Sequence, residues 1–210
     1  MEPALEKYIE AHISPEPDCL HRIDRLTNLR LVNGRMCSGH LQGRLLKMLT
    51  AMAKPRRVLE LGTFSGYSAL CIAEALEGDA TVDTVEVFDE LEDFIRKNLA
   101  SSPFGERVCL HIGDALEVMK KWENDTFDLI FIDADKRIYP EYFLRCRDLL
   151  KSGGFIIADN TLWDGHVTES NPSSAQTKGI QAFNDMAAAD PEFDTVIIPL
   201  RDGLTILRKK

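Results

Sequence analysis

Short apolar segments alternate with amphipathic ones from Arg57 onward, and this alternation limits the possible folds more than any other feature of the chain. The pattern predicts strands over residues 57–62, 81–87, 107–112, 127–133 and 154–160, and helices over residues 67–76, 89–100, 115–122, 139–150 and 177–188. Asp89 and Asp114 are expected to be helix N-caps, and Lys151–Gly154 is expected to end a helix. Such regular alternation is typical of a parallel sheet with helices on both faces.

The end of the chain departs from this alternation. Phe193–Leu200 and Leu204–Arg208 both have the apolar character of strands, and only Arg201–Gly203 separates them. Three residues are too few for a crossover helix, so the two strands are expected to form an antiparallel hairpin. We therefore predict a doubly wound α/β fold with a seven-stranded, mainly parallel sheet and one antiparallel strand.

Residues 1–54 have helical rather than strand-like spacing. The apolar positions that carry this spacing are Leu5, Tyr8, Ile9, then Ile23, Leu26 and Leu29 within Cys19–Leu31, and finally Leu41, Leu45, Leu46 and Leu49. No linker follows them. We expect one domain over residues 1–210, with a helical N-terminal extension at 1–54 packed on a Rossmann-like core at 55–210.

The composition excludes several classes of protein. A net charge of −9, from 34 acidic and 25 basic residues, disfavours a nucleic-acid partner. The five cysteines are scattered singly, which is expected of reduced, buried thiols rather than of a disulfide framework or a zinc ribbon. No apolar run is long enough to span a membrane, and the N-terminus lacks the pattern of a signal peptide. We therefore expect a cytoplasmic protein without a membrane partner.

Polar residues that could bind a ligand or take part in catalysis follow the predicted strands at their carboxyl ends, where ligands bind in sheets of this kind. The turn Glu60–Gly66 has the spacing G-x-x-x-G instead of the dinucleotide fingerprint G-x-G-x-x-G, and its leading carboxylate suits a cationic ligand better than a pyrophosphate. Glu86 is placed to accept hydrogen bonds from a ribose, and Asp114 follows the third strand, where an adenine would lie. The alternative interpretation of this pattern is structural: the glycine turn would only cap a helix, and Glu86 and Asp114 would be surface carboxylates without a ligand.

The segment Val58–Ser68 resembles motif I of S-adenosylmethionine-dependent methyltransferases. The similarity is strongest to the cation-dependent O-methyltransferases, which include the catechol and caffeoyl-CoA enzymes. It extends from about Met36 to the C-terminus, and its other anchors are Phe131–Lys136, Asp159–Trp163 and the Asp202–Gly203 hairpin. The resemblance implies a class I methyltransferase fold, S-adenosylmethionine as cofactor and a homodimer.

The resemblance also assigns cofactor contacts to matching positions. Glu86 would hold the ribose, where plant members carry Asp, and Ala115 would meet the adenine. Ser38 would contact the cofactor from the extension, although its segment matches by spacing more than by identity. The remaining implied cofactor contacts are Glu60, Gly62, Thr63, Ser68, Asp133 and Asp135.

A second implied site combines a metal with a base. Asp133, Asp159 and Asn160 offer only oxygen ligands, a set that suits Mg²⁺, or else Mn²⁺ or Ca²⁺. In the resembling family these positions hold the metal, so Asp133 takes part in catalysis, and Lys136 accepts the proton of the substrate hydroxyl. Trp163 and Asp164 would lie over a small aromatic acceptor; plant members often carry Asn at the latter position, which weakens an inference to a coenzyme A ester.

Two other hypotheses remain open at this point. A nicotinamide-dependent oxidoreductase can use a similar sheet, although Glu60 and the missing third glycine speak against it. A non-catalytic methyltransferase-like binding protein is the other, and the intact set of Asp133, Lys136, Asp159 and Asn160 speaks against that. The five histidines show no metal-binding spacing and receive no role.

Overall fold

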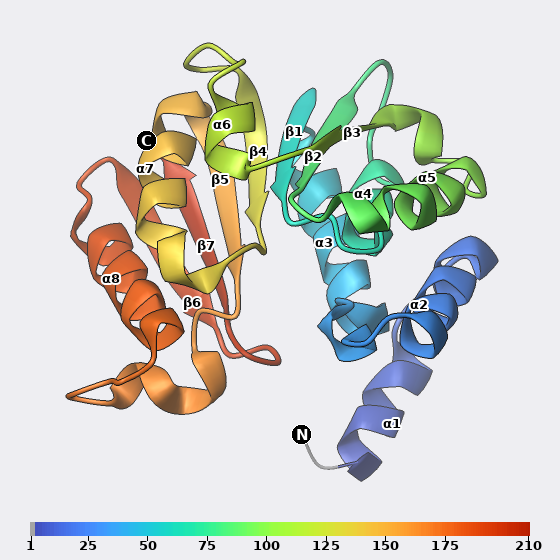
Figure 1. The fold of residues 1–210 in the computed structure, drawn as a ribbon, viewed down its shortest axis with the longest axis horizontal. Helices are drawn as coiled ribbons and strands as arrows, with labels where there is room; N and C mark the ends of the chain where they lie inside the picture. The colour runs from blue at the N-terminus through green and yellow to red at the C-terminus, as the bar shows by residue number, and fades with distance from the viewer. Residues whose placement is uncertain (1–2) are drawn as a thin grey trace.

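The computed structural model describes residues 3–210 and shows a central sheet between two layers of helices (Figure 1). The strands are β1 (Arg57–Leu61), β2 (Thr81–Glu86), β3 (Val108–Ile112), β4 (Phe127–Ile132), β5 (Leu150–Asp159), β6 (Phe193–Ile198) and β7 (Leu204–Lys209). The α-helices are α1 (Pro3–His12), α2 (Asp18–Arg30), α3 (Gly39–Ala53), α4 (Tyr67–Ala73), α5 (Glu92–Ala100), α6 (Ala115–Met119), α7 (Tyr139–Leu149) and α8 (Ala175–Ala189). Short 3₁₀ turns are η1 (Gly34–Met36), η2 (Asp89–Leu91), η3 (Gly105–Arg107), η4 (Lys136–Ile138) and η5 (Trp163–Thr168).

The seven strands form one sheet in the order β3-β2-β1-β4-β5-β7-β6. The strands β1 to β5 pair in parallel, whereas β7 runs antiparallel to both of its neighbours, β5 and β6. The predicted fold class and the terminal hairpin are thus confirmed. The reversed strand lies one place inside the edge, because β6 takes the edge position.

Apolar residues on each side of the sheet bury a separate layer of helices. Leu59, Ile130 and Ile156 pack with residues of α6, α7 and α8, whereas Val58 and Phe131 pack with residues of α3 and α4. Side chains alternate between the two faces of a strand, so central strands with helices on both sides must be apolar almost throughout. The reversal of strand order at β1 and β4 leaves the carboxyl ends of these two strands at the edge where ligands bind in such sheets.

Helices α2 and α3 of the N-terminal extension pack against α4, and α2 also contacts α5 (Figure 1). Ile23 of α2 is fully buried as the helical spacing predicts, and it packs with Leu20 of α2 and with Tyr67 and Leu70 of α4. Leu29, expected on the same apolar face, is instead 70% exposed, one residue before the end of α2. In the described residues no helix is both long and apolar enough to cross a membrane.

Several predicted helix boundaries are wrong: α4 ends at Ala73 rather than at residue 76, and α6 ends at Met119 rather than at residue 122. Asp89 does not cap a helix through its side chain; it begins the 3₁₀ turn η2, and α5 starts only at Glu92. Glycines do not end α7 either, since its C-cap Leu150 is already extended and β5 runs through Lys151–Gly154. The helix therefore passes directly into the strand. Asp114 does cap α6 as predicted, accepting a hydrogen bond from the Glu117 N–H at 3.1 Å.

Candidate active site

The ends of β1 and β4 approach each other closely, and Gly62 makes this approach possible. Its φ is +96°, and a Cβ at this position would lie 2.0 Å from the carbonyl oxygen of Asp133. The Asp133 N–H continues the sheet pairing by donating to the Leu61 carbonyl at 2.8 Å. Any side chain larger than hydrogen would push the two strand ends apart, which explains the glycine in this turn.

Glu60 is completely buried at the end of β1. Its Oε2 accepts a hydrogen bond from the Thr84 hydroxyl, whereas its Oε1 has no hydrogen-bond partner among the described residues. Burial raises the pKa of Glu60 to about 8, although hydroxyl groups of Ser68 and Thr84 oppose the rise. The unpaired Oε1 is thus open to a hydrogen bond from a polar or cationic ligand.

Glu86 ends β2 with both carboxylate oxygens held by the backbone. The Phe64 N–H donates to Oε2 at 2.7 Å, and the Phe88 N–H donates to Oε1 at 2.9 Å. The first contact fixes the glycine turn after β1 against the end of β2, with Phe64 at a left-handed φ of +51°. Each carboxylate oxygen has further lone pairs, so Glu86 can still accept hydrogen bonds from a diol.

Asp133 and Lys136 form an ion pair at the end of β4. The Lys136 Nζ lies 2.7 Å from Asp133 Oδ1, and both side chains are largely shielded, with 14% and 19% of their surface exposed. The same Nζ lies 5.6 Å from the ring centroid of Tyr139. The ammonium is thus held beside the strand end by a carboxylate and an aromatic face.

Asp159 and Asn160 end β5 in a constrained geometry. Asp159 is buried, and its Oδ1 accepts the backbone N–H of Asn160 at 2.8 Å while Asn160 adopts a left-handed φ of +59°. Burial raises the pKa of Asp159 to about 6; the negative charge of Asp133 adds to this, and a hydrogen bond from Gln42 opposes it. The two carboxylates therefore destabilise each other as anions, a situation that a bound cation relieves.

Gln42 and Arg201 were not predicted, yet both connect to this cluster. The Gln42 Nε2 donates to Asp159 Oδ2 at 2.7 Å, and its Oε1 accepts from Arg201 at 3.1 Å. The same guanidinium nitrogen also donates to the carbonyl oxygens of Cys37 and Ser38. Gln42 lies on α3 and Arg201 on the turn between β6 and β7, so no local spacing in the sequence relates them to Asp159.

The other predicted cofactor positions differ in how they are placed. Ser38, Thr63, Ser68 and Ala115 are buried around the strand ends. Asp135 caps η4, and its carboxylate is engaged by the Arg137 backbone and guanidinium, whose hydrogen bonds hold its pKa below the ordinary value. If Asp135 also contacts the cofactor, its carboxylate must bind the cofactor and Arg137 at the same time.

The segment expected to cover the acceptor is a strained turn. Trp163, Asp164 and Gly165 have φ values of +46°, +49° and +82°. Trp163 is partly buried and packs against the core formed with α7 and α8, whereas Asp164 is exposed and donates its backbone N–H to Asp202. This contact ties the turn to the terminal hairpin.

Comparison with known protein families gives a match over nearly the whole chain. A family model described as O-methyltransferase matches residues 10–210. The match begins well before Met36, so the resemblance in the sequence was placed too late: it includes most of the helical extension.

Curated relatives and solved structures agree with this match. The chain is 31% identical to caffeoyl-CoA O-methyltransferase of Petroselinum crispum, over 98% of this chain and 90% of the relative, and 32% identical to catechol O-methyltransferase of Niastella koreensis, over 76% and 73%. The O-methyltransferase TomG from Streptomyces achromogenes, solved with SAM, has a TM-score of 0.93 at 26% identity, covering 100% of this chain and 99% of TomG. An O-methyltransferase from Bacillus cereus, solved with SAH, has a TM-score of 0.92 at 26% identity, covering 99% and 97%.

Proposed function

The chain belongs to the O-methyltransferase family of the caffeoyl-CoA and catechol enzymes, and on that premise we propose that it methylates a small aromatic acceptor with the help of a divalent cation. One arrangement carries the proposal: the paired Asp133 and Lys136 and the carboxylate of Asp159 lie beside the buried Glu60. Family membership replaces the hypothesis of a nicotinamide-dependent oxidoreductase.

The residues around Gly62 fit S-adenosylmethionine. The unpaired buried Oε1 of Glu60 suits a ligand that carries an ammonium and a sulfonium group. Glu86, fixed by two backbone N–H groups, offers its remaining lone pairs to the ribose hydroxyls. Buried Ala115 at the start of α6 provides an apolar contact for the adenine, and Ser38, Thr63 and Ser68 complete the proposed cofactor site.

The residues at the ends of β4 and β5 fit a divalent cation. Asp133, Asp159 and Asn160 supply two carboxylates and an amide oxygen, which are hard ligands of the kind that Mg²⁺ and Mn²⁺ prefer. Burial and the neighbouring charge of Asp133 raise the pKa of Asp159 to about 6, which supports a cation at this position. A cation bound there would lower the pKa of an acceptor hydroxyl and orient its oxygen.

The chain's own residues then position the reactants and move one proton. Lys136 in its neutral form accepts the proton of the acceptor hydroxyl at Nζ while the hydroxyl oxygen forms a bond to the methyl carbon of the sulfonium, whose carbon–sulfur bond breaks. The products are the methyl ether, S-adenosylhomocysteine and a protonated Lys136. Since this is an in-line displacement, much of the acceleration comes from holding oxygen and methyl in contact. Asp133 orients Lys136 through the 2.7 Å contact between its Oδ1 and Nζ.

The acceptor is proposed to be a small aromatic with adjacent hydroxyls. Two neighbouring oxygens on one ring can share a single cation, which matches the donor set of Asp133, Asp159 and Asn160. Trp163, partly buried at the start of the strained turn, offers a ring face for stacking, and the exposed Asp164 would line the mouth of the site.

We propose that the protein forms a homodimer, as the family resemblance implies. Its support lies in the extension, where large apolar side chains remain exposed: Leu5, Tyr8, Leu29, Val32, Met36, Met48 and Met52. Contiguous exposed apolar patches are typical of protein–protein contacts, and these residues are the candidates for such a contact. Sedimentation equilibrium tests this directly, and a monomer at all concentrations would contradict it.

Two assays test the function itself. Calorimetry should show binding of S-adenosylhomocysteine, and Glu86→Ala should weaken it. Methylation of catechol should require Mg²⁺ and stop with EDTA. Cofactor binding together with methylation that EDTA does not affect would leave the transferase intact and overturn the metal-assisted chemistry. Cofactor binding without any methyl transfer across a panel of catechols, hydroxycinnamoyl esters and flavonoids would favour a binding protein.

A further inference from the structure

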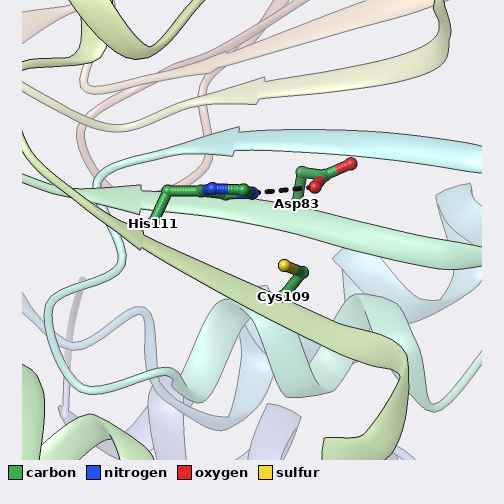
Figure 2. A group of neighbouring side chains, drawn as sticks. All are labelled: Asp83, Cys109 and His111. Atoms are coloured by element: carbon green, nitrogen blue, oxygen red, sulfur yellow. Dashed lines mark hydrogen bonds and ion pairs between the residues drawn. The ribbon is translucent and has the colours of Figure 1, made fainter. Parts of the chain in front are cut away.

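A second cluster of potential metal ligands lies on β2 and β3, on side chains outside the site described above (Figure 2). In the parallel pairing, Asp83 is the partner of Cys109, and Val85 is the partner of His111. Alternate residues of a strand share a face, so Cys109 and His111 point the same way, together with Asp83 from the neighbouring strand. One ligand atom from each of the three lies within 4.8 Å of the others.

The cluster is organised before any ligand binds. The His111 Nε2 lies 2.8 Å from Asp83 Oδ1, while Asp83 Oδ2 is held by the Arg57 guanidinium at 2.7 Å. The Trp122 ring packs edge-on against the imidazole with a centroid distance of 5.3 Å. Asp83 and His111 are thus oriented by neighbours that are not ligands themselves, which is the role that surrounding residues have in metal sites.

The cluster is also accessible. Cys109 is exposed because β3 is an edge strand, and the His111 side chain retains 22% exposure, whereas Asp83 is buried at their side. The composition-based expectation of buried thiols holds for Cys37, Cys71 and Cys146 but is wrong for Cys109. An ion can therefore reach the sulfur, nitrogen and oxygen atoms from solvent.

We propose that Asp83, Cys109 and His111 bind a thiophilic divalent ion, with Zn²⁺ as the favoured one. Thiolate, imidazole and carboxylate are together the ligands of Zn²⁺, and water would complete a four-coordinate shell. The ion would displace the proton between His111 Nε2 and Asp83 Oδ1, so that the neutral imidazole carries its proton on Nδ1, and the Cys109 thiol would release its proton to the buffer. The site would join edge strand β3 to β2.

This site differs in chemistry from the one at the ends of β4 and β5. Asp133, Asp159 and Asn160 offer only oxygens and suit Mg²⁺, whereas a thiolate and an imidazole select softer ions. The guanidinium of Arg57 lies on the far oxygen of Asp83, so it compensates part of the carboxylate charge without blocking Oδ1. The proposal is therefore independent of the proposed function.

Cobalt provides the test, because Co²⁺ replaces Zn²⁺ and a cobalt–thiolate bond gives an intense near-ultraviolet absorption band that oxygen ligands do not give. Titration of the full chain with Co²⁺ should produce this band, and added Zn²⁺ should remove it. Cys109→Ser should abolish the band, and His111→Ala should weaken Co²⁺ binding. The band should persist in Asp159→Asn and in the matched cysteine control Cys19→Ser.

Thermal melting provides a second readout and verifies that the variants fold. Zn²⁺ should raise the Tm of the unaltered protein, since an ion that binds the folded state stabilises it, and should not raise that of Cys109→Ser. No band with Co²⁺, a band that survives in Cys109→Ser, or a band lost in Asp159→Asn would overturn the proposal.

Discussion

The Gln42 side chain donates a hydrogen bond to Asp159 Oδ2 at 2.7 Å, which connects the helical extension directly to a proposed metal ligand. The other oxygen of the same carboxylate accepts the backbone N–H of Asn160, so both oxygens of Asp159 have a fixed direction. Helix α3 therefore contributes to the candidate active site through a residue that touches neither cofactor nor substrate in the proposed mechanism.

Gln42→Met should weaken binding of the divalent cation. Methionine keeps the length and apolar contacts of the side chain but cannot donate to Asp159, and loss of a residue that orients a ligand typically costs 10- to 100-fold in metal affinity. Electron paramagnetic resonance of Mn²⁺ titrated into the protein measures this affinity without an activity assay. Gln176→Met, at an exposed position, is the matched control and should bind Mn²⁺ as before. Equal Mn²⁺ affinity in both variants would show that Gln42 does not orient Asp159 for the cation.

Arg201→Met should act through the same route. Its guanidinium holds Gln42 Oε1 and the carbonyl oxygens of Cys37 and Ser38, so its loss frees the Gln42 amide. The effects of Gln42→Met and Arg201→Met on Mn²⁺ affinity should then be non-additive, with a coupling of about 0.5–3 kcal/mol in a double-mutant cycle. Strict additivity would mean that the two residues support the site separately.

Lys136→Met should reduce the rate of methyl transfer by about 10²- to 10⁴-fold, the usual contribution of a general base. Affinity for S-adenosylhomocysteine should change far less than the rate, because Asp133 is the one implied cofactor contact with which Lys136 pairs among the described residues. Calorimetry and initial rates separate the two quantities. Lys120→Met, which removes an exposed ion pair with Glu117, is the control. A variant at position 136 with the original rate would contradict the assignment of the base.

Stability of the ligand-free protein should fall as pH rises from the unfolded pKa of Glu60, 4.5, to the folded value of about 8. Below this window both states hold the proton. Within it the unfolded chain has released its proton and the buried carboxyl has not, so folding becomes less favourable as pH increases. Urea unfolding across this range measures the slope. In Glu60→Gln the fall should be smaller, and an unchanged slope would show that Glu60 does not titrate in this window.

The sequence predicted those features that depend on local pattern. Apolar periodicity identified the strands, and the three-residue gap at Arg201–Gly203 identified the hairpin, because both are set by neighbours in the chain. Asp114 was found as a cap because capping acts over three residues. The end of α7 was misplaced, since Leu150 already pairs with Phe127 of β4 and so begins β5, whereas Lys151–Gly154 form an irregularity in the pairing, with Gly153 at a φ of +80°.

Local sequence pattern could not predict the contacts between residues that are far apart in the chain. Gln42 and Asp159 are 117 residues apart, and only the packing of α3 beside the end of β5 brings them together. The group of Asp83, Cys109 and His111 had one local signal, the alternate positions of Cys109 and His111 on a predicted strand, but the third member depends on the register of β2 against β3. The sequence identifies candidate residues, whereas helix packing and strand register determine which of them come into contact.

The most direct test of the central claim is a Mg²⁺ titration of methyl transfer to catechol by EDTA-treated protein with S-adenosylmethionine present. We expect no transfer without the ion, saturable recovery with Mg²⁺, and no recovery in Asp159→Asn, whose S-adenosylhomocysteine affinity should remain. Full transfer in the presence of EDTA, or full recovery in Asp159→Asn at the same Mg²⁺ concentration, would contradict it.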